Sequence, residues 1–104
     1  MVLLARADQT GARVIVPCTA LAQAIRDPSR KARLARLLRQ PLTDVVALDR
    51  VDATGVGRLL AASGSTDIAD AHVVLCARRS YTSVVTSDPD DLRALDPTLA
   101  LTVV

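Results

Sequence analysis

Aromatic side chains are almost absent from this sequence of 104 residues. It contains a single tyrosine, Tyr81, and neither phenylalanine nor tryptophan. Because aromatic rings supply much of the buried area in most cores, this core has to be built from Leu, Val, Ile and Ala. No aromatic residues are interleaved with the arginines either, so we expect no platform on which nucleic-acid bases could stack.

Other residue types that carry common chemistries are also scarce. The single histidine, His72, is expected at the surface or at the edge of the core. The two cysteines, Cys18 and Cys76, match no metal-binding spacing and are expected as buried free thiols. There is no glycine-rich phosphate loop and no G-x-S-x-G nucleophile motif, which disfavours phosphate-loop enzymes and α/β-hydrolases.

The charge is unusual in kind but modest in amount. All acidic residues are aspartate, all basic residues except Lys31 are arginine, and the net charge is +2. Such a charge permits a polyanionic partner without requiring one. The apolar runs are much shorter than the roughly 20 residues of a membrane span, and there is no basic, apolar leader. We therefore expect a cytoplasmic protein with no membrane partner.

Strand-like and helix-like segments alternate along the chain. Short, continuously apolar runs predict strands at 13–17, 44–48, 82–86 and 99–104. Helical patterns cover 18–26, 29–39, 50–62, 67–79 and 89–95. Residues 2–8 are interpreted as the end of a helix that a turn at Gly11 closes. The alternation predicts one α/β domain spanning 1–104, with a mostly parallel sheet flanked by helices.

Aspartates three residues apart stand at three predicted helix starts. These D-x-x-D pairs are Asp49/Asp52, Asp67/Asp70 and Asp88/Asp91. Aspartate favours the N-cap and the first helical turn, so helix capping alone explains any one pair.

Two of these pairs also have a special position. Asp88 follows the strand at 82–86, and Asp67 and Asp70 begin the helix that leads into that strand. Ligands of open α/β sheets bind at the carboxyl ends of the strands, and clustered carboxylates suit hard divalent cations. We expect the carboxylates of Asp70 and Asp88 to lie within about 4–8 Å of each other. Mutual repulsion should raise the pKa of at least one of Asp67, Asp70 and Asp88.

Five segments together resemble the PIN-domain ribonucleases of the VapC toxin type. They cover essentially the whole chain and read, in order, VIVP, TALAQAIR, KARLARLLRQ, GRLLAASGSTDIADAHVVLCA and VVTSDPDDLRAL. The last two are the most specific, because a D-x-x-D-A helix start followed by a strand and T-S-D-P-x-D-L is typical of the C-terminal half of that family. The resemblance implies a PIN-like three-layer sandwich, with helices flanking the sheet.

The resemblance also implies an activity and a site. In that family a cluster of four acidic residues binds Mg²⁺ or Mn²⁺ and cleaves RNA, and a cognate antitoxin protein inhibits the toxin. Asp70 and Asp88 match the third and fourth acidic positions, which makes them the implied metal ligands. Asp67 and Asp91 match acidic positions that often accompany these, and Thr86 matches a small polar residue close to the site.

Two departures from the family pattern concern the rest of that cluster. The second acid of the family commonly lies in the helix after VIVP, where this chain has Gln23, whose amide offers an oxygen without a charge. The first acid lies on a central N-terminal strand, and this chain starts after that strand. The strands on either side would then face a gap, which favours a homodimer or an N-terminally longer native protein.

Two functions therefore stay open. One is a Mg²⁺-dependent endoribonuclease that cleaves RNA by metal-activated water at the aspartate cluster. The other is a catalytically degenerate domain that binds an antitoxin or pairs with itself. A phospho-acceptor receiver is disfavoured, because no lysine is suitably placed after a strand.

Overall fold

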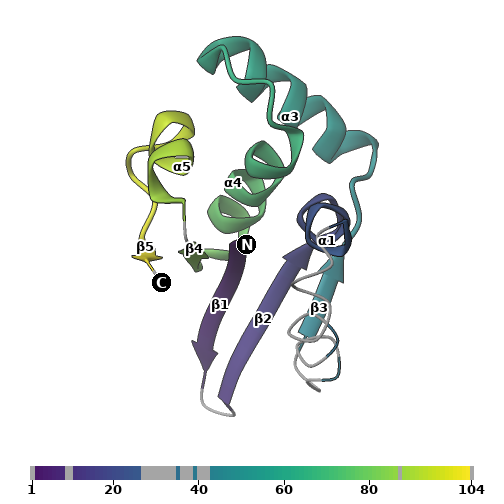
Figure 1. Cartoon of the computed structure of the whole chain (residues 1–104), viewed down its shortest axis with the longest axis vertical. Coiled ribbons are helices and arrows are strands. Elements are labelled where there is room, and N and C mark those ends of the chain that lie inside the picture. The colour runs from purple at the N-terminus through teal and green to yellow at the C-terminus, as the bar shows by residue number, and fades with distance from the viewer. Residues whose placement is uncertain are drawn as a thin grey trace.

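The computed structural model describes residues 2–8, 11–26, 35, 39, 43–86 and 88–103. Their elements, in chain order, are β1 (Val2–Asp8), β2 (Gly11–Pro17), α1 (Cys18–Ile25), β3 (Thr43–Val46), α3 (Arg50–Ser63), α4 (Ile68–Ser80), β4 (Ser83–Thr86), α5 (Pro89–Leu95) and β5 (Leu101–Val103) (Figure 1). The strands and helices predicted from residue 13 onwards are confirmed here, with small shifts at their ends. The exception is the predicted helix over 29–39, which lies largely outside the described residues.

The described strands form one sheet in the order β3-β2-β1-β4-β5. β2 pairs with β3, and β4 pairs with β5, in parallel. β1 lies between these two pairs and runs antiparallel to both β2 and β4. The α/β class is therefore confirmed, but the sheet is mixed instead of mostly parallel.

The N-terminal segment is the main correction to the sequence interpretation. Residues 2–8 form the central strand of the sheet and are not the end of a helix. Leu4 of β1 is aligned with Ile15 of β2 on one side and with Val84 of β4 on the other. This pairing satisfies backbone N–H and C=O groups that would otherwise face a gap beside apolar surface. The expectation of a homodimer or a longer native protein rested on a gap in the sheet, and β1 fills that gap.

The same pairing explains why Gly11 does not close a helix. Asp8 of β1 is aligned with Gly11 of β2, so only residues 9 and 10 connect two antiparallel strands. A two-residue connection between paired strands is the commonest form of a β-hairpin. Gly11 therefore begins a strand, and the hairpin supplies the central strand that the sequence interpretation takes as missing.

Helix α4 is the centre of the hydrophobic core. The main buried cluster joins α4 to β4 and α5 and consists of Val73, Val74, Cys76, Ala77, Val84, Leu92 and Leu95. No aromatic ring takes part in it, and Tyr81 is 95% exposed. Helices α1 and α4 contact the sheet and also contact each other, which places both on one face. The second helical layer of a three-layer sandwich is not shown within the described ranges. None of the described helices is long and apolar enough to cross a membrane.

The strand directions bring several loops to one edge of the sheet. Since β1 is antiparallel to both β2 and β4, these two strands run the same way, as do their parallel partners β3 and β5. Helices α1, α3 and α5 therefore begin beyond the carboxyl ends of β2, β3 and β4. Figure 1 shows α3, α4 and α5 gathered at the end of the molecule away from the β1–β2 hairpin. This edge is where ligands bind in open α/β sheets.

Candidate functional site

The turn between α3 and α4 positions the first two aspartates of the candidate site. Asp67 is the N-cap of α4, and its Oδ1 accepts a hydrogen bond of 2.9 Å from the backbone N–H of Asp70. The backbone N–H of Asp67 in turn donates to Oγ of Ser65 at 3.2 Å. The expected capping role of Asp67 is therefore confirmed, and any part it has in metal binding comes in addition to capping.

The end of β4 positions the other two aspartates. Thr86 is fully buried, and its Oγ1 accepts a hydrogen bond of 2.9 Å from the backbone N–H of Asp88. Asp88 is exposed and stands at the N-cap of α5, but its side chain makes no capping hydrogen bond. Asp91 follows in the first turn of α5. Thr86 thus fixes the backbone of Asp88 while the Asp88 carboxylate is not used for capping.

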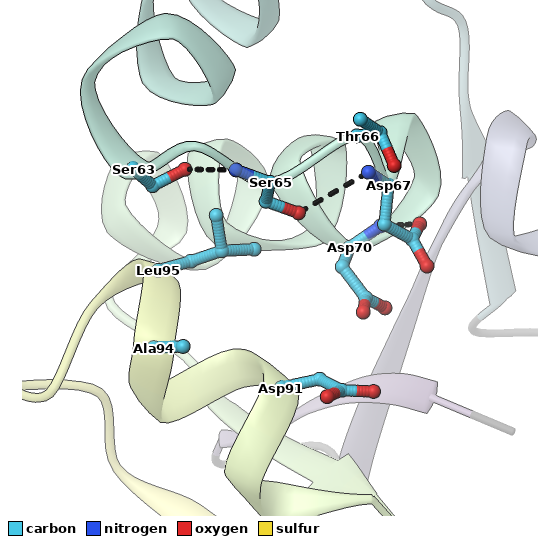
Figure 2. A pocket seen from close by; sticks show the side chains of 8 residues that line it. All are labelled: Ser63, Ser65, Thr66, Asp67, Asp70, Asp91, Ala94 and Leu95. Carbon is cyan, nitrogen blue, oxygen red and sulfur yellow. Dashed lines mark hydrogen bonds between the residues drawn. The ribbon is translucent and has the colours of Figure 1, made fainter.

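Three of these aspartates line a cavity of about 200 Å³ between the α3–α4 turn and α5. Its lining residues are Ser63, Ser65, Thr66, Asp67, Asp70, Asp91, Ala94 and Leu95. Figure 2 shows the Asp70 side chain directed towards α5 and Asp91. Asp88 does not line this cavity, although it belongs to the same group of charges, as the electrostatics of Asp70 show.

The pKa of Asp70 is raised to about 6. Burial of the carboxylate is the largest cause, and the negative charge of Asp67 is the second. The charge of Asp91, a hydrogen bond with Asp67 and the charge of Asp88 raise this pKa further. The expected upward shift is confirmed for Asp70, with burial ahead of repulsion as its cause. The other three aspartates therefore all raise the pKa of Asp70. The expected distance between the carboxylates of Asp70 and Asp88 stays a prediction.

The helix start at Asp49 has the same cap as the one at Asp67, but the pKa of its second aspartate, Asp52, is shifted in the opposite direction to that of Asp70. Oδ1 of Asp49 accepts a hydrogen bond of 2.8 Å from the backbone N–H of Asp52, as Asp67 does from Asp70. The Asp52 carboxylate, however, accepts hydrogen bonds of 2.8 and 3.2 Å from the Arg79 guanidinium. This contact is the main reason why the pKa of Asp52 is lowered. Capping alone therefore does not explain the raised pKa of Asp70, which comes from its surroundings.

Gln23 is not brought into this group by any contact in the described part of the chain. It lies on α1 with an exposed side chain. The start of β1 also reaches this edge of the sheet, because Val2 is aligned with Thr86. The one acidic residue of β1, Asp8, lies at the hairpin end instead. The acidic cluster thus consists of Asp67, Asp70, Asp88 and Asp91.

A second polar group, inside the helices, is missed by the sequence interpretation. Asp52, His72 and Cys76 are all buried, and one ligand atom of each lies within 4.8 Å of the others, so the group could hold a metal ion. His72 is fully buried, so its expected place at the surface or core edge is wrong. The signal available in the sequence was the spacing of His72 and Cys76, which lie four residues apart and share one helix face.

Comparison with known proteins identifies no relative of this chain. No protein-family model matches it, and neither a curated protein nor a solved structure does so.

Proposed function

We propose that this chain is a metal-dependent endoribonuclease of the PIN toxin type, with the acidic cluster as its site. The observation that carries the proposal is the convergence of charge on Asp70, whose pKa is raised by burial and by the three other aspartates. Carboxylates that repel one another are stabilised when a divalent cation binds between them, and oxygen ligands suit Mg²⁺ or Mn²⁺. The location at the carboxyl edge of the sheet supports a ligand site.

The four aspartates have different roles in this proposal. Asp70 and Asp88 are the metal ligands: the first is partly buried, and the second has a carboxylate that capping does not use. Asp67 orients Asp70 through the cap and adds negative charge, and Asp91 adds negative charge from α5. Thr86 positions Asp88 through the hydrogen bond to its backbone N–H.

The chemistry follows from this arrangement. A divalent cation held there would supply an activated water and would stabilise the leaving oxygen of a phosphodiester. The chain itself supplies a concentrated negative field and, at Asp70, a carboxyl that can hold a proton near neutral pH. The proposed substrate is RNA in the cytoplasm, and the proposed inhibitor is a cognate antitoxin protein.

The second candidate function is a catalytically degenerate domain that binds an antitoxin or pairs with itself. Two observations favour it. β1 brings no acidic residue to the edge where it lies beside Thr86. Gln23, where the family commonly has an acid, is exposed on α1.

RNA cleavage by the full chain separates the two functions. An endoribonuclease should cleave a fluorescent single-stranded RNA with Mg²⁺ or Mn²⁺ and lose that activity with chelator or with Asp88→Asn. The matched control is Asp49→Asn, because Asp49 caps a helix at the same edge but lies outside the acidic cluster. A degenerate domain should show no cleavage with either ion, and cleavage that survives chelation contradicts the proposed mechanism.

A further inference from the structure

We propose that Asp52, His72 and Cys76 form a second metal site, separate from the acidic cluster and selective for a thiophilic ion such as Zn²⁺ over Mg²⁺. The three side chains offer an oxygen, a nitrogen and a sulfur atom, all within 4.8 Å of one another and all buried. Zn²⁺ accepts this mixture of ligands, whereas Mg²⁺ requires oxygen and does not bind thiolate. The site therefore differs from the acidic cluster in the class of ion it takes.

The spacing of the oxygen and nitrogen atoms suits a tetrahedral ion. Oδ2 of Asp52 lies 3.3 Å from Nε2 of His72. Two ligands at the usual zinc distances of about 2.0–2.1 Å, at a tetrahedral angle, are about 3.3–3.4 Å apart. The separation of these two atoms therefore already suits an ion between them. Cys76 has to move only slightly closer, because its Sγ lies within 4.8 Å of a ligand atom of each of the other two residues.

The orientation of His72 is fixed from its other side. Nδ1 of His72 lies 2.8 Å from Oγ1 of Thr19, within hydrogen-bond distance. Histidines that bind metals characteristically use their second ring nitrogen in such a bond, which sets the ring orientation. If Nδ1–H donates to Thr19, the Nε2 lone pair is directed at the Asp52 carboxylate. A cation between the two atoms then takes the place of the Nε2 proton that donates to Asp52 in the other tautomer.

Arg79 takes the place of that cation in the present arrangement. Its guanidinium donates to both oxygens of Asp52 and also lies 3.7 Å from Sγ of Cys76. Two of the three proposed ligands therefore already share one positive charge. The Arg79 side chain is 54% exposed, so it can turn into solvent when a dication arrives. The dication would then neutralise the buried Asp52 carboxylate, which is costly to leave unpaired.

Cys18, a half-buried free thiol at the start of a helix that packs against α4, is a candidate for a fourth ligand. It begins α1, while Asp52 belongs to α3 and the other two ligands to α4. An ion at this place would connect three helices in a small chain whose core, in its described part, has no aromatic ring. Structural zinc sites stabilise small folds in this way.

Metal titration of the full, chelator-treated chain tests the proposal. In an Asp88→Asn background, which removes the proposed Mg²⁺ site of the acidic cluster, we expect one Zn²⁺ to bind per chain and to raise the melting temperature, and Mg²⁺ at the same concentration to leave it unchanged. Co²⁺ should give a thiolate-to-metal charge-transfer band. Cys76→Ser should abolish this band and the Zn²⁺ shift, and the control Asp90→Asn, at an exposed position outside both sites, should leave them intact.

Arg79→Gln keeps the test decisive if Cys76→Ser does not fold. Without metal, this variant should melt at a lower temperature than the wild type, because the Asp52 carboxylate loses its partner. Added Zn²⁺ should bind more tightly than to the wild type and restore the melting temperature. Failure of Zn²⁺ to bind or to shift melting in the wild type and in Arg79→Gln would overturn the proposal, as would a Co²⁺ band that persists in a folded Cys76→Ser.

Discussion

Replacing Asp70 by asparagine should stabilise the metal-free protein at neutral pH. The pKa of Asp70 is about 6 in the folded chain against an ordinary value of 3.8, so the folded state binds the proton more strongly than the unfolded state. A carboxyl with a raised pKa lowers stability as the pH rises from about 4 through about 6. The full difference corresponds to about 3 kcal/mol. Partial solvent exposure and screening reduce this to about 1–2 kcal/mol.

Asparagine cannot ionise at position 70, so this penalty disappears in the variant. The favourable contact of a negative charge with the N-terminus of α4, worth about 0.3–1 kcal/mol, is lost as well. We therefore expect a net gain of about 1 kcal/mol at pH 7.5, shrinking towards zero as the pH falls to about 4.

Urea denaturation in the presence of chelator at pH 7.5, 6 and 4.5 measures this gain. The matched control is Asp52→Asn, which changes the corresponding residue of the other capped helix start. Because Asp52 is hydrogen-bonded to Arg79, whose half-exposed side chain can turn to solvent when its partner is lost, the substitution should destabilise the protein at pH 7.5 by about 1–3 kcal/mol. If Asp70→Asn also destabilises the chain at pH 7.5, or if its effect does not depend on pH, the electrostatic account of the acidic cluster is refuted.

Two further substitutions test other parts of the structure. Asp96→Asn removes the charge that accepts hydrogen bonds from Thr98 and Arg78 and whose pKa those bonds lower. The substitution should lower the free energy of unfolding by about 1–2 kcal/mol at pH 7. Urea denaturation should show this loss vanishing as the pH falls below 3.8, because the stability that a lowered carboxyl pKa contributes is lost there. An unchanged loss at low pH would contradict this. Thr86→Val keeps the shape of the side chain but removes the acceptor of the Asp88 N–H. It should cost about 1–3 kcal/mol and weaken Mn²⁺ binding, and undiminished Mn²⁺ affinity would separate Thr86 from the site.

Most elements were predictable because their signals are local. The apolar run before Pro17, the cap at Asp67 and the proline that follows Asp88 each mark the beginning or end of an element within a few residues. Residues 2–8 have no such signal. Their strand depends on partners far away in the sequence, Ile15 on one side and Val84 on the other. Seven residues are also too few for periodicity to distinguish a strand from a helix end.

The candidate sites, too, are predictable from the sequence only where their signals are local. The order of the aspartates along the chain indicated that Asp67, Asp70 and Asp88 belong to one edge of the sheet. It could not indicate that burial is the main cause of the raised pKa of Asp70, because burial depends on the packing of α4 against α5. The approach of Asp52 and Arg79, which lie on different helices, depends on the packing of α3 against α4 and leaves no pattern in the sequence.

The acidic cluster is proposed to hold one divalent cation, with Asp70 and Asp88 as its ligands. Paramagnetic broadening of backbone amide signals by substoichiometric Mn²⁺ tests it directly. The signals of Asp70, Asp88 and Asp91 should broaden first, recover when Mg²⁺ is added in excess, and stay sharp in Asp88→Asn. Equal broadening at Asp49, which caps α3 outside the cluster, or no selective broadening at all, would contradict the claim.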